Sequence, residues 1–299
     1  MKQRAEYYVI KFFLLLGKML PKNFIYGLCR WIFKFYYWYK PKRVSIMHSN
    51  IKKGFPEKAS KDIEKSGIEV YVQASRALAE TILLYNNRLD IDSSIVNKGE
   101  AIARLEQTRS VSKMGILFIT AHYANWELLG QFLGKHGFPV VNVTKDSSNS
   151  LIDDMLITPF RQRYGSKMLR HQGSVVSLAK TLKRNEIASL MIDQVVQPPN
   201  GVIINFFGHA TTASKAIAVL KLKYNPLIVP IFITRVGFEK FEITINDSVE
   251  VELEDTMSKD EQIVIMTQKY MDIIEAQISK EPTQWLWLYN RWKRIKFEK

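Results

Sequence analysis

The sequence predicts an α/β fold, in which a mostly parallel central sheet lies between layers of helices and follows an N-terminal helical segment. Two patterns carry this prediction. From about residue 115, short apolar runs alternate with helical stretches, which is typical of parallel strands joined by helices. Residues 44–110 instead combine helix-forming residues with apolar positions three and four apart, which predicts helices alone. A chain of 299 residues is long enough for one large domain with a sizeable core.

The first 43 residues are at once basic, aromatic and apolar. Residues 1–60 carry thirteen lysines and arginines against two acidic residues, and residues 1–40 hold 13 aromatic residues. Basic residues among aromatics suit an anionic membrane surface or single-stranded nucleic acid. The long aliphatic runs favour the membrane, because a nucleic-acid groove does not need them. We therefore interpret residues 1–43 as a membrane anchor, and we expect membrane lipids rather than nucleic acid as the partner.

This anchor is expected to lie in the membrane surface. Its apolar runs are interrupted by lysines and arginines before they reach the roughly 18–20 residues of a spanning helix. Pro21 divides the segment into two helices. No small-residue cleavage site follows, so a retained segment is favoured over a signal peptide. A tilted insertion and a pair of amphipathic core helices are the alternatives.

Five short apolar runs are the predicted strands of the domain that follows, residues 44–299. They are rich in the β-branched and aromatic residues that strands favour. We expect the sheet-containing core within residues 111–299, with strands at 115–120, 139–144, 187–192, 227–234 and 241–246 and helices at 124–134 and 174–184.

Several kinds of chemistry are excluded or disfavoured by composition. The single cysteine, Cys29, rules out an internal disulfide and a CxxC pair for metal or redox chemistry. The GxSxG sequence of a serine-hydrolase nucleophile elbow is also absent. We expect neither a metal nor a tightly bound cofactor.

A histidine and a glutamate lie five residues apart in the segment FITAHYANWELLG, residues 118–130. This HX4E spacing is weak evidence alone, but its setting adds weight. His122 follows a predicted strand, at the end where open α/β sheets bind ligands. Glu127 falls in the first turn of the next helix, where the helix dipole favours an acid. The alternative is a core histidine beside a helix-capping acid.

The pair has a simple mechanism. A carboxylate bonded to one ring nitrogen holds a neutral histidine in one tautomer and stabilises the imidazolium that forms. The other nitrogen can then take a proton from an alcohol that attacks a thioester. The sequence therefore predicts His122 as a general base and Glu127 as the acid that orients it.

The segment AHYANWELLG at 121–130 resembles the catalytic motif of the late acyltransferases of lipid A biosynthesis, a family that includes the phosphatidylinositol mannoside acyltransferases. Further matches follow in the family's order and span nearly the whole chain. They are NIKKGFPE at 50–57, RQRYG at 161–165, DQ at 193–194, FFGHATT at 206–212, VP at 229–230 and EPTQWLWLYNRWK at 281–293.

The resemblance implies a glycerolipid-acyltransferase-like enzyme at the cytoplasmic face of the bacterial inner membrane. It would move a fatty acyl chain from an acyl carrier protein or coenzyme A thioester, the only co-substrate, to a lipid hydroxyl, most simply in lipid A biosynthesis. Acceptors such as a mannosylated phosphatidylinositol or an aminolipid, and a non-catalytic membrane-binding relative, are the alternatives.

The resemblance also implies roles for residues near the motifs. His122 and Glu127 are similar to the family's base and its orienting acid. Positive charge beside them could stabilise an oxyanion or bind acceptor phosphates. The expected substrate-binding residues are Asn125, Lys145, Arg161, Arg163, Asp193, Gln194, Gly208 and Thr212.

Each of these has a structural interpretation as well. Arg161 and Arg163 could end a solvated helix, and Asp193 could cap a turn. Gly208 is expected to allow a tight turn, and Thr212 to cap the helix that follows it.

The C-terminal motif departs from the family pattern. Tyr289 stands where many relatives have a histidine, and Thr283 where a glutamate is common, so a role for that histidine does not carry over. The tryptophans are interpreted as packing or interface residues. A second membrane-contacting patch is the further possibility, formed by Trp285, Trp287, Trp292, Arg291, Lys293, Arg294 and Lys296.

Overall fold

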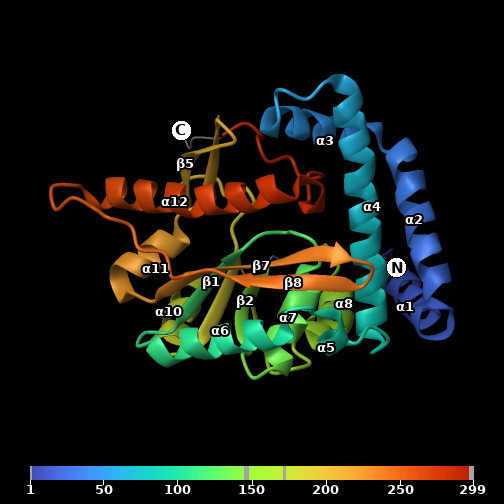
Figure 1. Cartoon of the computed structure of the whole chain (residues 1–299), viewed down its shortest axis with the longest axis horizontal. Helices are drawn as coiled ribbons and strands as arrows, with labels where there is room; N and C mark the ends of the chain where they lie inside the picture. Colours follow the sequence, from blue (N-terminus) through green and yellow to red (C-terminus); the bar gives the residue numbers. More distant parts are fainter. Residues whose placement is uncertain (1, 145–147, 171–172, 296–299) are drawn as a thin grey trace.

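The centre of the molecule is a six-stranded sheet with the order β3-β2-β4-β1-β7-β8 (Figure 1). The computed structural model describes residues 2–144, 148–170 and 173–295. Neighbouring strands from β3 to β7 are parallel, and β8 is antiparallel to β7. The predicted α/β fold with a mostly parallel sheet is confirmed. The strands are β1 (Ile116–Thr120), β2 (Val140–Thr144), β3 (Lys167–Arg170), β4 (Ile187–Met191), β7 (Leu227–Gly237) and β8 (Lys240–Ile245).

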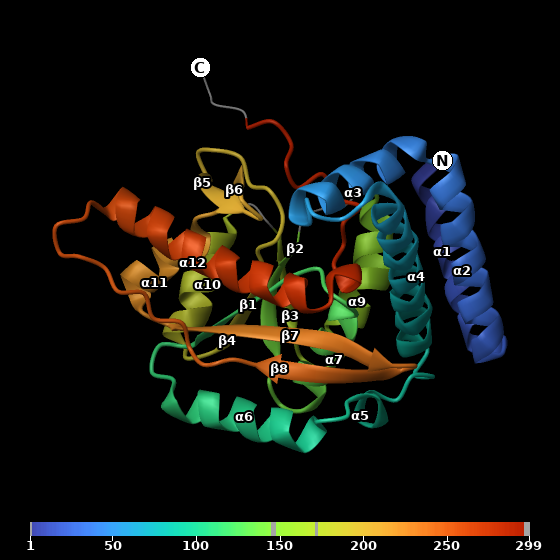
Figure 2. The same cartoon turned by 45° about the horizontal axis from the view of Figure 1, so that its top comes forward.

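Helices cover both faces of the sheet. Figure 2 shows α12 above the sheet, on the same side as α10 and α11, and α6 below it. The elements after residue 90 are α5 (Ile91–Ser94), α6 (Lys98–Val111), α7 (Trp126–Lys135), α8 (Ser150–Ile152), the π-helix η1 (Asp153–Ile157), α9 (Thr158–Arg161), α10 (Ser174–Lys183), α11 (Ala216–Tyr224), α12 (Lys259–Lys280) and the 3-10 helix η2 (Pro282–Gln284).

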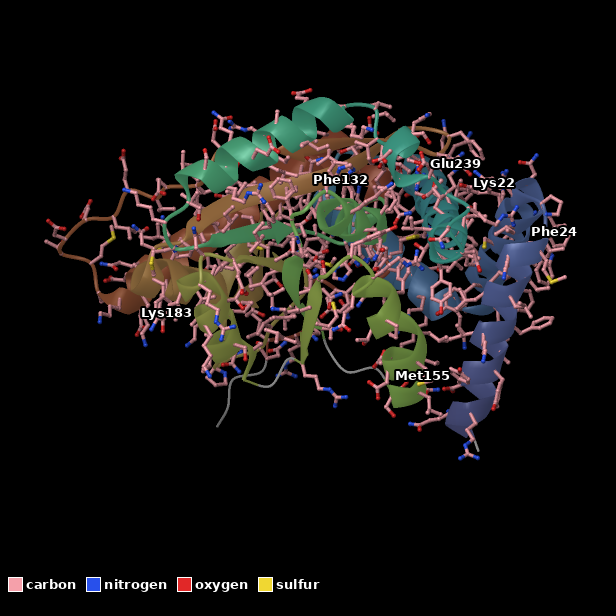
Figure 3. All side chains as sticks on the ribbon, turned by 90° about the horizontal axis from the view of Figure 1, so that it is seen from below. Lys22, Phe24, Phe132, Met155, Lys183 and Glu239 are labelled. Atoms are coloured by element: carbon pink, nitrogen blue, oxygen red, sulfur yellow. The ribbon has the colours of Figure 1, made fainter. Side chains whose placement is uncertain are left out.

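The N-terminal part is entirely helical, as predicted. Its helices are α1 (Lys2–Met19), α2 (Lys22–Tyr39), α3 (Pro41–Gly54) and α4 (Ser60–Tyr85), and Pro21 separates the first two. The long α4 lies between α2 and the sheet domain (Figure 1). Figure 3 shows α1 and α2 at one edge of the molecule, with Phe24 on the outer side. In the described part of the chain no helix has the length and apolar character needed to cross a bilayer.

All five predicted strands form, and three further strands were missed. One of these, β3, is a four-residue edge strand that begins with Lys167 and ends with Arg170. The other two, β5 (Gly201–Phe206) and β6 (His209–Ser214), form a separate hairpin. Its turn is Phe207–Gly208, with positive φ at both residues. The tight turn expected at Gly208 is confirmed, because glycine adopts this backbone readily.

The helix cap predicted at Thr212 is wrong. Thr212 lies inside β6 and pairs with Ile203, because the hairpin continues to Ser214 before the helix begins. The N-cap position of α11 is Lys215, and the Ser214 hydroxyl accepts a hydrogen bond from the backbone N–H of Ala216 at 3.3 Å.

The prediction of a second membrane-contacting patch in the C-terminal segment is also wrong for three of its residues. Trp285, Trp287 and Arg291 are buried in the core. Trp285 and Trp287 stack edge to face, with ring centroids 4.6 Å apart. The packing interpretation of these two tryptophans is thereby confirmed. Lys296 lies outside the described residues.

A buried ion pair joins α4 to the sheet. The guanidinium of Arg235 in β7 donates to both carboxylate oxygens of Glu80, and its Nε donates to the Gln73 side chain at 3.0 Å. Asn125, the N-cap of α7, donates to Glu80 Oε2 at 3.0 Å. One carboxylate therefore connects three elements around the edge of the sheet.

Replacing Glu80 with Gln should lower the free energy of unfolding by about 3–5 kcal/mol, because it leaves the Arg235 charge buried and uncompensated. Urea unfolding followed by circular dichroism measures the change. Glu64→Gln, at an exposed position of the same helix, serves as the control and should change stability by less than about 0.5 kcal/mol. Equal stability of the two variants would contradict a structural role for the pair.

Candidate active site

The order of the strands brings His122 and Asp193 together. β1 and β4 are adjacent and parallel, and their last residues, Thr120 and Met191, lie opposite each other. His122 and Asp193 each follow two residues after these strand ends. Nδ1 of His122 lies 2.8 Å from Asp193 Oδ1, and the backbone N–H of His122 donates to Oδ2 at 3.0 Å. The two side chains thus meet at the carboxyl edge of the sheet, where α/β folds bind ligands.

Asp193 fixes the tautomer of the histidine. Its carboxylate also accepts a hydrogen bond from Nε1 of the buried Trp285 at 2.8 Å. An ionised carboxylate can only accept hydrogen bonds, so Nδ1 of His122 carries the proton and Nε2 has the free lone pair. The His122 side chain is 21% exposed, whereas that of Asp193 is 3% exposed. Nε2 faces the Gln194 amide at 3.5 Å, the outer limit of a hydrogen bond.

The two groups shift each other's pKa in opposite directions. Burial would lower the pKa of His122, but the charge and hydrogen bond of Asp193 outweigh it, so the pKa lies above its ordinary value. Burial would raise the pKa of Asp193, but the charge of His122 and the hydrogen bonds from His122 and Trp285 hold it below its usual range. Asp193 is therefore ionised at neutral pH, and His122 is a stronger base than a free imidazole.

Glu127 does not occupy the position that the sequence predicts for it. The hydrogen bond expected from the His122 ring to Glu127 goes to Asp193 instead. Glu127 accepts hydrogen bonds from Arg161, whose Nε lies 3.0 Å from Oε2 and whose Nη2 bonds to Oε1. The reason is that α9 places Arg161 beside the first turn of α7. Glu127 still lines the same cavity as His122, and a catalytic role for it stays a prediction.

Asn125 and Arg163 have structural partners. The Asn125 side chain caps α7 by accepting from the backbone N–H of Leu128 at 3.1 Å, although the residue also lines the cavity beside His122. The guanidinium of Arg163 donates to the backbone carbonyls of Leu84 and Tyr85 at the end of α4. These contacts favour a structural role for Arg163 over the predicted contact with substrate.

The remaining predicted residues divide into three groups. Gln194 lies next to the histidine ring. Gly208 and Thr212 lie on the β5–β6 hairpin and are not among the described residues that line the His122 cavity. Lys145 lies outside the described residues.

An apolar cavity of about 300 Å³ opens beside His122. Helices α2 and α4 supply one wall of this cavity, and the segment after α12 supplies another. The volume is at the lower end of the range for ligand pockets, about 300–1,000 Å³. Its apolar lining residues are Phe33, Val70, Ala74, Ala77, Leu78, Ala124, Trp126, Trp285, Leu286 and Leu288. The arrangement holds a base at the mouth of a space suited to hydrocarbon.

Two residues of the C-terminal segment support the site without having been predicted as part of it. The carbonyl of Gln284 accepts from the backbone N–H of Ala124 at 2.9 Å, and Trp285 holds Asp193. The sequence analysis interprets Trp285 as a packing or interface residue. A buried indole N–H usually donates to a hydrogen-bond acceptor, so a buried Trp285 implied that an acceptor lies nearby. The sequence could not identify Asp193 as that acceptor.

Comparison with known proteins identifies the family. The family model described as bacterial lipid A biosynthesis acyltransferase matches residues 2–294. The chain belongs to this family. A lipid A biosynthesis acyltransferase of Haemophilus influenzae is 24% identical over 261 residues, 86% of this chain and 80% of that protein. The lipid A biosynthesis palmitoleoyltransferase of Escherichia coli K12 is 21% identical over 256 residues, 84% of this chain and 79% of that protein.

Membership confirms the resemblance found in the motifs, and with it the prediction of an enzyme. This member of the lipid A biosynthesis acyltransferase family is an O-acyltransferase.

Asp193→Asn should move the pH profile of the reaction as well as its rate. In the parent enzyme the free base appears only above the raised pKa of His122, so kcat/KM should rise as pH rises through that value. Loss of the carboxylate lowers that pKa, and the rising limb should move to lower pH. The maximal rate should fall roughly 10²–10⁴-fold, because the favoured tautomer and the stabilised imidazolium are lost.

Glu127→Gln is the matched control for this measurement, since it removes a nearby carboxylate that bonds to Arg161. Its rising limb should move much less. A larger shift in Glu127→Gln than in Asp193→Asn would restore Glu127 as the partner of the histidine.

Proposed function

We propose that this acyltransferase moves a fatty acyl chain from an acyl carrier protein or coenzyme A thioester to a hydroxyl group of a lipid acceptor in lipid A biosynthesis. The observation that carries the proposal is the His122–Asp193 pair at the mouth of an apolar cavity. The relatives in Haemophilus influenzae and Escherichia coli are acyltransferases of lipid A biosynthesis, which supports the choice of lipid A over a mannosylated phosphatidylinositol or an aminolipid.

The chemistry follows from the orientation of the ring. Nε2 of His122 removes the proton from the lipid hydroxyl while the hydroxyl oxygen attacks the thioester carbonyl. The resulting tetrahedral oxyanion collapses, the C–S bond breaks, and the imidazolium returns the proton to the departing thiolate. Asp193 stabilises the imidazolium between these steps. The Gln194 amide, which faces Nε2, is placed to donate a hydrogen bond to the oxyanion.

The apolar cavity fits the acyl chain of the donor. Its walls from α4 and α2 offer side chains without charge, such as Ala77 and Phe33, and a charged headgroup there would lose its hydration without gaining partners. Placing the hydrocarbon in this cavity brings the thioester carbonyl to its mouth, next to the histidine.

We also propose that α1 and α2 bind the enzyme to the cytoplasmic face of the inner membrane. Trp31, Phe35 and Tyr39 stack along the outer side of α2, with successive ring centroids 6.0 and 5.6 Å apart. Trp31 is 64% exposed, which is unusual for so large an apolar ring. Further exposed apolar residues on these helices are Tyr8, Val9, Ile10, Phe12, Leu15, Met19, Phe24, Tyr36 and Trp38. Phe33 of the same helix lines the cavity, so the proposed membrane face adjoins the acyl site.

His122→Ala should abolish acyl transfer without changing membrane binding, because the base and the exposed aromatic residues belong to different elements. Mass spectrometry of lipids from cells that express the parent chain should show a lipid A species heavier by one acyl group, and cells with the variant should lack it. Vesicle sedimentation checks that binding is retained. Continued transfer by purified His122→Ala at the parent rate would refute the mechanism.

The variant Trp31→Ser/Phe35→Ser/Tyr39→Ser should lose most of its sedimentation with anionic phospholipid vesicles. The matched control is Val96→Ser/Val111→Ser/Val176→Ser, three exposed apolar residues away from these helices, and it should sediment like the parent. If the triple aromatic variant still sediments fully, or if salt-sensitive binding to single-stranded DNA depends on residues 1–43 instead, the membrane proposal fails.

A further inference from the structure

Trp126, the first residue of α7, packs against the ring of His122. The ring centroids are 5.2 Å apart and the ring planes are inclined at 74°, so the edge of one ring contacts the face of the other. This contact leaves no space for a water molecule between the two rings. Trp126 is half-buried and lines the same apolar cavity as His122. Because Asp193 covers Nδ1 at 2.8 Å, the imidazole is enclosed on two sides and Nε2 is the atom left for a substrate.

The backbone between the two rings is held in an uncommon conformation. Ala124 has a φ of +48°, in the left-handed region, which costs a residue with a Cβ atom roughly 1–2 kcal/mol. Two hydrogen bonds to the C-terminal segment maintain it. The N–H of Ala124 donates to the carbonyl of Gln284 at 2.9 Å, and the carbonyl of His122 accepts from the N–H of Leu286 at 3.1 Å. Backbone strain of this kind is concentrated at functional sites, and here it turns the chain so that His122 and Trp126 line one cavity.

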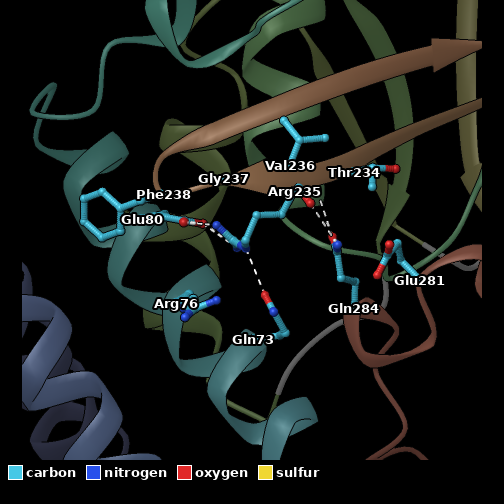
Figure 4. Close-up of a pocket in the computed structure, with 10 residues that line it drawn as sticks. All are labelled: Gln73, Arg76, Glu80, Thr234, Arg235, Val236, Gly237, Phe238, Glu281 and Gln284. Atoms are coloured by element: carbon cyan, nitrogen blue, oxygen red, sulfur yellow. Dashed lines mark hydrogen bonds and ion pairs between the residues drawn. The ribbon is translucent and has the colours of Figure 1, made fainter. Parts of the chain in front are cut away.

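Most polar side chains that line this cavity are already bonded to other groups of the protein. Gln73 and Gln284 bond to Arg235, as the dashed lines of Figure 4 show. Asn125 caps α7, and the Glu127 carboxylate is paired with a guanidinium of α9. A water molecule needs several polar partners to stay inside a cavity, and apolar cavities remain dry. Water therefore has few places to bind in the interior of this cavity, and it reaches the site mainly through the mouth beside His122.

Water at this mouth would compete with the lipid hydroxyl. A base that activates an alcohol also activates water, because both offer an O–H group. Nε2 of His122 would take a proton from the water while the water oxygen attacks the thioester carbonyl. The C–S bond would then break and the imidazolium would return the proton to the thiolate. The products would be a fatty acid and a thiol, and the lipid would stay unacylated, so transfer requires that water is kept from the carbonyl.

We propose that Trp126 is a specificity-determining residue that keeps water from the thioester carbonyl and so favours the lipid hydroxyl over hydrolysis. When the acyl chain occupies the cavity, the indole covers the mouth beside His122. A lipid acceptor gains free energy by burying its apolar surface against the indole, whereas a water molecule has no such surface to bury. This role rests on the proposed function, because it takes a thioester as the donor and a lipid as the acceptor.

The partition of the donor between transfer and hydrolysis tests this role. Purified full-length enzyme receives lauroyl-coenzyme A and an acylated glucosamine disaccharide bisphosphate, and hydrolysis is the thiol released minus the acylated lipid formed. Trp126→Ala should raise the ratio of hydrolysis to transfer roughly 10–100-fold, the range in which apolar contacts discriminate between substrates. Trp126→Leu removes the ring but keeps apolar volume, and its ratio should rise as well, whereas Trp126→Phe should stay close to the parent. The ratio does not depend on the fraction of protein that is folded, so lost stability alone would not change it.

The matched control is Leu78→Ala, which widens the same cavity from the α4 wall. Its ratio of hydrolysis to transfer should equal that of the parent, because the cover beside His122 is intact. A parental ratio in both Trp126→Ala and Trp126→Leu would overturn the proposal. Equal rises in Trp126→Ala and Leu78→Ala would also overturn it, since any widening of the cavity would then admit water.

Hydrolysis of p-nitrophenyl laurate separates this inference from the proposed function, because this ester needs no lipid acceptor. Trp126→Ala should hydrolyse it at least about tenfold faster than the parent. Trp126→Ala/His122→Ala should lose the gain, because the same base activates the water. An unchanged rate in Trp126→Ala, or a gain that persists without His122, would overturn the role even if transfer to lipid is observed. A gain that depends on His122 would support the role even if no transfer to the lipid acceptor is found.

Discussion

The hydrogen bond between His122 and Asp193 depends on the pairing of β1 with β4. The two strands are parallel neighbours, and the register that sets Thr120 opposite Met191 also sets the two functional residues side by side. A slip of one residue would turn the side chains of one strand to the other face of the sheet and separate the pair. The geometry of this pair is therefore a property of the buried sheet, whose side chains allow little movement.

The C-terminal segment closes the site from the other side. Trp285 donates to Asp193, and the backbone of residues 284–286 pairs with the loop that carries His122. Asn50 of α3 holds the segment in turn, because its amide donates to the carbonyls of Trp287 and Tyr289 at 2.8 and 2.7 Å. The motifs at 50–57 and 281–293, which are far apart in the sequence, are thus one structural unit behind the His122–Asp193 pair.

Short-range sequence patterns predicted the features of the fold that depend on neighbouring residues in the chain. Apolar runs gave five strands of the sheet, and the strand end before His122 placed that residue at the functional edge. The partner of His122 could not be predicted, because Asp193 is 71 residues away and becomes a neighbour only through the strand order. Glu127 was favoured since it is close in sequence, and the structure gives its hydrogen bonds to Arg161. Strands β3 and β6 lack the apolar runs on which the prediction relied, whereas β5, with the sequence GVIINF, has such a run and was still missed.

The charges around the ring explain why Asp193 controls its proton affinity. Arg161 lowers the pKa of His122 and Glu127 raises it, so this bonded pair has opposing effects at the ring. The buried Arg291 contributes a compensating positive charge, since its guanidinium, with a pKa lowered to about 10 by burial, is still protonated at neutral pH. When Nε2 takes a proton, the His122–Asp193 pair changes from one negative charge to none. In the proposed mechanism this proton comes from the attacking alcohol inside the site, so the total charge does not change and the negative charge moves from the pair to the developing oxyanion.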